Sequence, residues 1–350
     1  METMSIYEAV KNNGDSEEEL KILELPVYIK EGDKMSTILS SKLMAYSSLI
    51  QKYASTLGFD GKQTSLLNQC VEQIISLVKK IEEAEFDNAY SGFISLFNLL
   101  GKVLINNKGQ FKSILLVPEK ELETNLFRAR GGNLTDKPIS EAYHAPLSKN
   151  YNCNTCRFSE SGYPMLYLSQ TEECLRYEFK DADEITIYMY EPKKYCNNDV
   201  KNDPDWQILD LAHPYSRQAY EIWTKAPKND EVNVIKNSFI RHLFWPIIAT
   251  CYCNYHLSPS SDELAQKERV YKVEYVFPQF LSRYLRSHHP YVSGIRYFTV
   301  RNKNLDSTSL YWTNYALFTD FSNSGDDDYD FKLLTKFYIK FHNHENLSKL

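Results

Sequence analysis

Apolar residues in the first hundred positions recur at the three- and four-residue steps of amphipathic helices. Three such stripes run over residues 35–57, 66–81 and 93–104, and polar turns such as GFDGKQ separate them. Because short loops favour antiparallel neighbours, the pattern predicts a small helical bundle over residues 35–105. We expect residues 1–34 to be partly ordered at most.

Near residue 110 the pattern changes to short segments rich in β-branched and aromatic residues, bounded by turn residues. The predicted strands are FKSILLVP, NLFRAR, MLYLSQ, ITIYMYEP, GIRYFTV, SLYWTNYALF and FKLLTKFYIKF. Helical patterns lie between them at residues 172–180, 216–225, 232–255 and 278–287. Since strands and helices do not alternate regularly, the sequence predicts an α+β fold rather than a doubly wound sheet. We therefore expect two domains, a helical one over residues 1–110 and a second over residues 111–350.

The composition is that of an ordinary globular protein, since 43% of the 350 residues are hydrophobic and 25% are charged. The net charge of −6 is opposite to the basic footprint of a general nucleic-acid binder. The N-terminus lacks the basic start and apolar run of a signal peptide, and the nearly apolar stretch at 243–253 is too short to cross a bilayer. The seven cysteines show no disulfide-framework spacing. These features predict a cytoplasmic protein with no membrane or nucleic-acid partner.

Motifs for common cofactors and metals are missing from the sequence. Neither GxGxxG nor GxxxxGK[ST] is present, so neither a Rossmann nor a P-loop phosphate site is predicted. Cys153 and Cys156 have the spacing of metal ligands, and Cys251 and Cys253 are the candidate partners for a four-ligand zinc site. A helix would direct that second pair to different faces, so we expect no metal site.

The motifs that point to chemistry lie in two blocks. In the first, Arg128 stands in LFRAR, Arg157 precedes a turn and the strand LYL, and Glu178 stands in CLRYEF. In the second, Gln279 stands in YVFPQF and Thr299 in GIRYFTV, and the segment WTNYALF with Asn314 follows. In their order and spacing, these motifs resemble the RES domain, a family named for a separated arginine, glutamate and serine. The resemblance covers roughly residues 111–341.

The resemblance implies an ADP-ribosyltransferase-like β-core with flanking helices, which uses NAD as a substrate and not as a bound cofactor. The implied reaction is cleavage of the nicotinamide–ribose bond by hydrolysis or phosphorolysis. Nicotinamide departs without a general acid, and a carboxylate such as Glu178 suits the oxocarbenium charge left on the ribose. Arg128 and Arg157 suit the pyrophosphate, and the ring of Tyr167 suits the nicotinamide.

Three further residues are implied by the family pattern. Gln279 and Asn314 are expected to contact NAD. Thr299 stands where the family has its serine, so the resemblance implies that Thr299, Glu178 and Arg128 are the catalytic residues. Threonine keeps the hydroxyl but adds a β-methyl group and a stiffer χ1.

Each residue also has a plain structural interpretation. Glu178 would then be a solvated carboxylate on an amphipathic helix, Tyr167 a core residue of an apolar strand, and Thr299 a residue favoured by strand propensity.

Three functions therefore stay open. The first is an NAD-degrading toxin, with a neutralising antitoxin or immunity partner and an N-terminal helical domain that regulates it or forms a homo-oligomer. The second is transfer of ADP-ribose to a macromolecule. The third is a non-catalytic nucleotide-binding module in which Thr299 marks lost activity.

Overall fold

The computed structural model describes residues 6, 9–10, 17–117, 122–179, 181–193, 207–212, 231–256, 271–299, 313–323 and 328–347. The chain divides into two compact units. The first comprises Met1–Ile114 and His213–Leu281, and the second comprises Leu115–Ala212 and Ser282–Leu350. The predicted boundary after residue 110 lies close to the first crossing. The observed division differs from the prediction because residues 213–281 return to the first unit.

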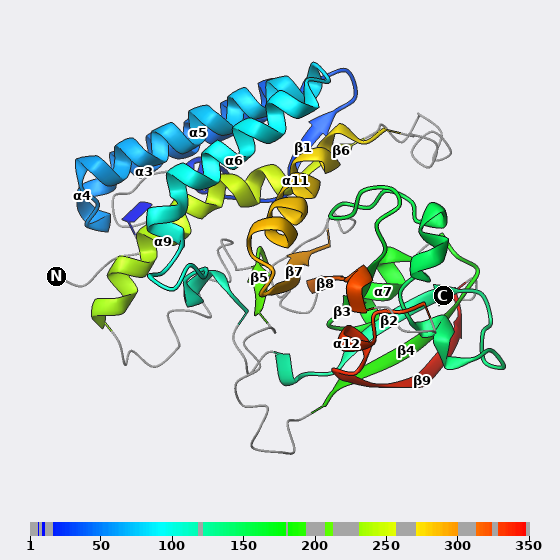
Figure 1. The fold of residues 1–350 in the computed structure, drawn as a ribbon. Helices are drawn as coiled ribbons and strands as arrows, with labels where there is room; N and C mark the ends of the chain where they lie inside the picture. Colours follow the sequence, from blue (N-terminus) through cyan, green and yellow to red (C-terminus); the bar gives the residue numbers. More distant parts are fainter. Residues whose placement is uncertain are drawn as a thin grey trace. The chain divides into compact units, whose positions relative to one another are not determined.

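The first unit contains long helices over residues 35–104, as the apolar stripes predict. They are α3 (Met35–Lys52), α4 (Ala54–Leu57), α5 (Gly61–Glu82) and α6 (Phe86–Leu104), preceded by the short α2 (Glu17–Lys21). Helix α5 contacts both α3 and α6, and the three run side by side (Figure 1). Asp60 begins α5 with a capping box, in which the Asp60 carboxylate accepts from the Gln63 amide and the Gln63 side chain accepts from the Asp60 amide.

Helix α9 (Glu231–Cys251) also belongs to the first unit. Nearly every side chain from residue 239 to residue 251 is buried, and a helix that is apolar on all sides must be enclosed by other elements. It packs on α5, and Trp245 stacks on Tyr46 with ring centroids 3.9 Å apart. The helical bundle therefore takes α9 into its core, which is the physical reason for the difference from the predicted domains.

A two-stranded parallel sheet completes the described part of this unit. Strand β1 (Val27–Lys30) pairs with β6 (Cys253–His256), so the expectation for residues 1–34 missed β1, and the helix predicted over 232–255 extends too far. Val27 and Ile29 are buried whereas Tyr28 is exposed, the period-two pattern of a strand. Helix α11 (Val273–His288) follows and runs from the first unit into the second.

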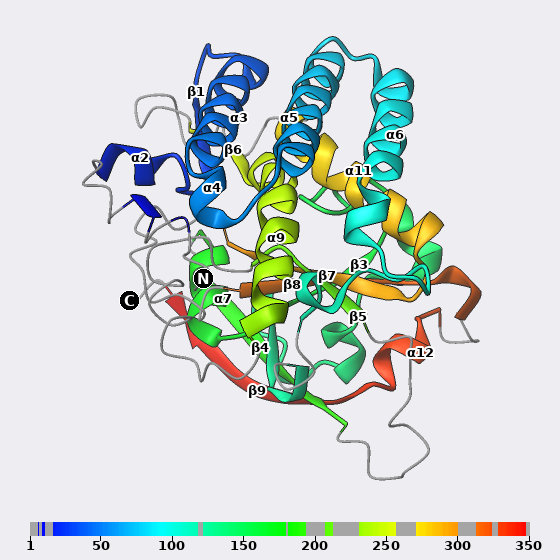
Figure 2. The same ribbon diagram turned by 90° about the vertical axis from the view of Figure 1, so that its left-hand side faces the viewer.

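The described strands of the second unit form a seven-stranded sheet with the order β5-β7-β8-β3-β2-β4-β9. Their bounds are β2 (Leu126–Gly131), β3 (Met165–Ser169), β4 (Glu184–Pro192), β5 (Gln207–Asp210), β7 (Val292–Phe298), β8 (Thr313–Phe318) and β9 (Phe337–Asn346). Neighbours are antiparallel except β5 and β7, which are parallel. Strands β4 and β9 lie side by side at one edge (Figure 2). The mixed sheet with flanking helices confirms the predicted α+β class.

Two predicted strands differ from the structure. In the segment predicted as a strand at 111–118, the described residues 111–117 form a 3₁₀ turn (η1, Ser113–Leu115) with isolated bridges at Phe111 and Leu116. Residues 331–341 begin with helix α12 (Phe331–Leu334), because the Asp330 carboxylate accepts from the Leu333 amide and caps a turn before β9. Strand β5 was missed. The helix predicted at 216–225 lies outside the described residues.

Side chains on the two faces of the sheet form separate clusters. One face holds Leu126, Leu166, Leu168, Tyr188, Tyr315 and Leu317. The other holds Ala129, Ile185 and Ile187, which pack against Leu175 of helix α7 (Glu172–Glu178). The loops also contain the 3₁₀ turns η3 (Ile139–Ala142), η4 (Leu147–Asn152) and η7 (Phe321–Asn323). No helix among the described residues is both long and apolar enough to cross a membrane.

Candidate active site

Glu178 is the last residue of α7, and local sequence explains why the helix forms there. The Thr171 side chain accepts a hydrogen bond from the Cys174 amide, at 3.2 Å, and caps the helix start. Acidic Glu172 and Glu173 occupy the first turn, where they interact favourably with the helix dipole. The buried Leu175 fixes the helix against the sheet. Glu178 is thereby held, half-buried, at the C-terminal end of a short, well-anchored helix.

Two side chains from the sheet donate hydrogen bonds to the Glu178 carboxylate. The Thr299 hydroxyl donates to Oε1, and the Asn314 amide nitrogen Nδ2 donates to the same oxygen at 3.2 Å. Thr299 directly follows β7 and is 1% exposed, and Asn314 lies on β8 and is 5% exposed. Both donors fix the position of the carboxylate, because each of them contacts the same oxygen atom.

The register of the strands explains how Thr299 and Asn314 come together. Asn314 lies opposite Tyr297 on β7 and opposite Ser169 on β3. Residues directly opposite each other project to the same face of a sheet, so Asn314, Tyr297 and Ser169 share one face. Thr299, two residues after Tyr297, projects to that face as well. This is the face that α7 covers.

Tyr167 projects to the same face, two residues before Ser169. Its neighbours Leu166 and Leu168 pack in the core of the opposite face, whereas the Tyr167 ring is half-buried. Its hydroxyl donates to Oγ of Ser159 at 3.1 Å. Tyr167 is therefore not a core residue of its strand, in contrast to the plain interpretation of the sequence.

Arg128 lies where strands β2 and β3 diverge. Phe127 of β2 and Ser169 of β3 are the one residue pair in register between these two strands, whereas all of β2 pairs with β4 on its other side. Next to that pair, Nη1 of Arg128 donates to the Tyr167 carbonyl at 3.0 Å. By alternation Arg128 faces the side of Tyr188, so its direct contact is with Tyr167 and not with Glu178.

The Arg128 guanidinium has few protein partners for a group that is 8% exposed. Within the described part of the chain, its Nε atom has no hydrogen-bond partner and the guanidinium forms no ion pair with a carboxylate. Burial, followed by the nearby charge of Arg130, lowers the pKa of Arg128 to about 9, so it remains a cation at neutral pH. An anionic ligand would supply the missing negative charge.

The remaining two predicted residues are Arg157 and Gln279. Arg157 is buried in the segment between η4 and β3, which is folded back by hydrogen bonds from the Cys156 amide to the Ser159 carbonyl and from the Gly162 amide to the Cys153 carbonyl. Gln279 is buried on α11, in the part of that helix that belongs to the first unit. The contacts described above come from the second unit alone.

Sequence reasoning missed two residues beside the carboxylate. Cys174 is 0% exposed, and its thiol lies 3.3 Å from Oδ1 of Asn314. The signal was present, because Cys174 precedes Glu178 by four residues and so lies on the same helix face. Tyr297 lies opposite Asn314, and burial together with the charges of Tyr167 and Glu178 raises its pKa above the usual value.

The part of the chain that the structure describes holds no cluster of three or more His, Cys, Asp or Glu side chains that could bind a metal ion. Cys153 and Cys156 are both half-buried and lie in the second unit, whereas the buried Cys251 and Cys253 lie in the first.

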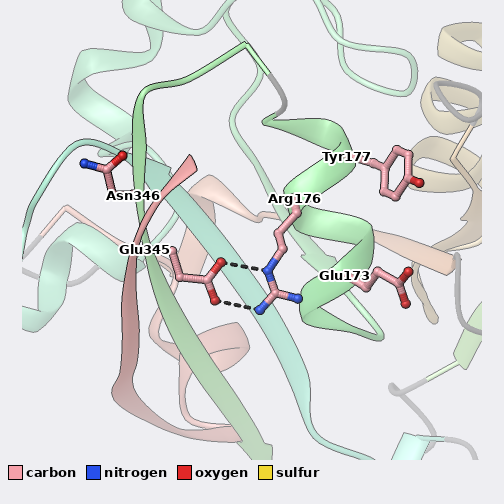
Figure 3. A pocket seen from close by; sticks show the side chains of 5 residues that line it. All are labelled: Glu173, Arg176, Tyr177, Glu345 and Asn346. Atoms are coloured by element: carbon pink, nitrogen blue, oxygen red, sulfur yellow. Dashed lines mark hydrogen bonds and ion pairs between the residues drawn. The ribbon is translucent and has the colours of Figure 1, made fainter. Parts of the chain in front are cut away.

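A surface hollow beside α7 is lined by Glu173, Arg176, Tyr177, Glu345 and Asn346, none of which was predicted (Figure 3). Its central feature is a two-pronged ion pair, in which Nε and Nη2 of Arg176 donate to the Glu345 carboxylate at 2.7 and 2.6 Å. His342 on the same strand, β9, lies 2.9 Å from the Glu172 carboxylate. These contacts fix α7 to β9, and so they support the helix that ends in Glu178.

Comparisons with known proteins give one distant relative. The protein named "Putative toxin YopC" from Bacillus subtilis (strain 168) is 21% identical over 302 residues, which cover 84% of this chain and 62% of the relative. This chain therefore spans less than two-thirds of that protein's length. No family model matches the chain, and no solved structure matches it. The likeness to the RES domain therefore depends on the motif residues and their arrangement.

Proposed function

We propose that this protein is a toxin-like enzyme that cleaves the nicotinamide–ribose bond of NAD. The observation that carries the proposal is the Glu178 carboxylate, which accepts hydrogen bonds from Thr299 and Asn314. Such a fixed negative charge, directed by donors from two strands, suits a positive charge that develops on a ribose. The similarity to a protein named as a toxin agrees with this function at a coarser level.

In the proposed reaction, the bond between the ribose C1′ atom and the nicotinamide nitrogen breaks, and its electron pair leaves with nicotinamide. The Glu178 carboxylate stabilises the oxocarbenium ion that remains. An oxygen of water or of inorganic phosphate then forms the new bond to C1′, and the attacking group releases its proton to solvent. The products are nicotinamide and either ADP-ribose or its phosphate ester.

The other predicted residues have binding roles in this proposal. Arg128 and Arg157 bind the pyrophosphate, and Arg128 suits the role because it is a buried cation whose Nε has no hydrogen-bond partner among the described residues. The half-buried ring of Tyr167 contacts the nicotinamide. Because NAD is an intracellular metabolite, the proposal includes a cytoplasmic location and a partner that neutralises the enzyme. A homo-oligomer formed through the helical unit is part of the same proposal.

Incubation of the purified full-length chain with NAD, with and without phosphate, tests the function. Release of nicotinamide with free ADP-ribose supports hydrolysis, and phosphate-dependent release with the phosphate ester supports phosphorolysis. ADP-ribose attached to an added cell extract would replace the proposal with transfer to a macromolecule. Binding of NAD without release of nicotinamide would replace it with a non-catalytic module.

A further inference from the structure

The Asn314 side chain lies between a thiol and a carboxylate. Its Nδ2 atom donates to Oε1 of Glu178 at 3.2 Å, and its Oδ1 atom lies 3.3 Å from Sγ of Cys174. Cys174 and Glu178 are one helical turn apart on α7, so a single helix contacts both ends of the amide. Asn314 and Cys174 are 5% and 0% exposed, which leaves the amide little access to bulk water.

A side-chain amide can face its neighbours in two ways, and only one of them suits Glu178. With Nδ2 toward the carboxylate, the amide donates a hydrogen bond and its oxygen needs a donor on the other side. In the reverse orientation, Oδ1 would face the carboxylate, and two acceptors would repel each other. Cys174 supplies the donor for the first orientation, because burial raises the pKa of its thiol to about 12 and keeps it protonated at neutral pH.

We propose that Cys174 is a positioning residue, whose thiol holds the Asn314 amide in the orientation that donates to Glu178. The thiol itself does not contact the reacting atoms. It acts through Asn314, which holds the Glu178 carboxylate in its orientation. The consequence for catalysis rests on the proposed cleavage of NAD, whereas the consequence for the orientation of the Asn314 amide does not.

Other groups also act on the Glu178 carboxylate. The Thr299 hydroxyl donates to it from the end of β7, and the Tyr297 phenol is near enough for the Glu178 charge to affect its pKa. Glu173 on α7, Tyr167 on β3 and Cys156 are further ionisable groups of the described residues in this neighbourhood, and the Ser169 side chain also hydrogen-bonds to the Cys174 thiol. All of these groups stay unchanged in the variants below, so a change in the rate of nicotinamide release reports on Cys174 and Asn314.

The test compares Cys174→Ala, which removes the donor, with Cys174→Ser, which restores one. Cys70→Ala is the matched control, because Cys70 is also fully buried on a helix and its thiol lies 3.8 Å from a backbone carbonyl, that of Leu243. We expect Cys174→Ala to lower kcat for nicotinamide release roughly tenfold with little change in KM. Cys174→Ser should recover most of the lost rate, and Cys70→Ala should keep the kcat and KM of the parent.

A readout that needs no turnover separates this inference from the proposed function. Nitrogen-15 NMR of the side-chain amide of Asn314, with its signal assigned from Asn314→Asp, reports directly on how firmly that amide is held. We expect its Nδ2 protons to exchange with solvent faster in Cys174→Ala than in the parent and in Cys174→Ser. Unchanged exchange in a folded Cys174→Ala variant would overturn the inference, as would a serine variant that matches alanine. A parent that shows the expected exchange pattern but no NAD cleavage would overturn the proposed function alone.

Discussion

The Thr299 hydroxyl donates a hydrogen bond to the Glu178 carboxylate, although 121 residues separate the two along the chain. Thr299 stands where the RES pattern has a serine, and the contact uses the hydroxyl that the two residues share. Threonine therefore retains the group that the carboxylate needs, and its β-methyl group is buried with the rest of the side chain.

Substitutions at Thr299 separate the hydroxyl from the methyl group. Thr299→Ser should keep NAD cleavage at the level of the parent or above it. Thr299→Val has nearly the same volume but no hydroxyl, so it should cost about 1–3 kcal/mol of transition-state stabilisation. Steady-state rates of nicotinamide release measure both variants. If the valine variant is as fast as the parent, Thr299 only fills its position next to the strand. If the parent is inactive and the serine variant releases nicotinamide, threonine at this position marks a lost activity.

Removal of the Arg128 guanidinium should weaken NAD binding. Arg128→Ala leaves the pyrophosphate without a buried cation, and we expect at least about tenfold weaker binding. Arg128→Lys should recover part of the affinity, because an ammonium group keeps the charge without the two-pronged geometry. Calorimetric titration of NAD into slow Glu178→Gln variants measures the affinity. Arg283→Ala, which removes an exposed arginine of the second unit, is the control, and equal affinity in both alanine variants would contradict the role of Arg128.

The ion pair between Arg176 and Glu345 should stabilise the fold in a pH-dependent way. Hydrogen bonding to Arg176 lowers the pKa of the Glu345 carboxylate. The contribution of the ionised Glu345 carboxylate to the free energy of unfolding is therefore fully present above the unfolded-state pKa of about 4.3. It is lost as the pH falls through the lower pKa of the folded state. Glu345→Gln should reduce the free energy of unfolding by about 1 kcal/mol at pH 7, and by less as the pH falls.

Urea unfolding of the full-length chain at several pH values measures this difference. Glu191→Gln is the control, since Glu191 pairs with Lys340 of the same strand β9 but both side chains are about half exposed, at 49% and 54%. It should have almost no effect. A Glu345→Gln difference that stays constant with pH would show that the variant acts by packing and not through the charge.

His242 in the first unit should make stability fall as the pH drops. Burial lowers the pKa of His242 to about 4, and its Nδ1 atom lies 2.8 Å from the Tyr46 hydroxyl. The stability that the neutral ring contributes is therefore fully present above the unfolded-state pKa of about 6.5. It is lost as the pH falls from there through the folded-state pKa of about 4, and the total loss in unfolding free energy is roughly 3 kcal/mol. His242→Gln cannot titrate, so its unfolding free energy should change less between pH 7 and pH 4. Parallel pH profiles of parent and variant would contradict this.

Side-chain periodicity in the sequence predicted individual elements well, because period is a local property. The stripe at 66–81 lies within α5, and the segment NLFRAR contains most of β2. Periodicity does not say which surface an element will cover. The apolar run of α9 predicts burial, but only the fold shows that the helix packs on α5. The described part of the β-rich segment, residues 111–117, forms isolated bridges in place of a strand.

The candidate site was predictable as a set of residue types but not as a geometry. Glu178, Thr299 and Asn314 were all identified, yet their contacts depend on strand register, which the sequence does not fix. Register also decides that Arg128 contacts Tyr167 through the gap between β2 and β3. Cys174 was missed because its role exists only through Asn314, 140 residues away.

The most direct measurement is the rate of nicotinamide release by Glu178→Gln and by the parent at saturating NAD. Glutamine keeps the shape of the side chain but removes the negative charge that faces the developing oxocarbenium ion. We predict that the variant folds normally, binds NAD, and loses roughly 100-fold or more in kcat with little change in KM. A folded Glu178→Gln variant that releases nicotinamide at the rate of the parent would contradict the assignment of Glu178, and with it the proposed mechanism.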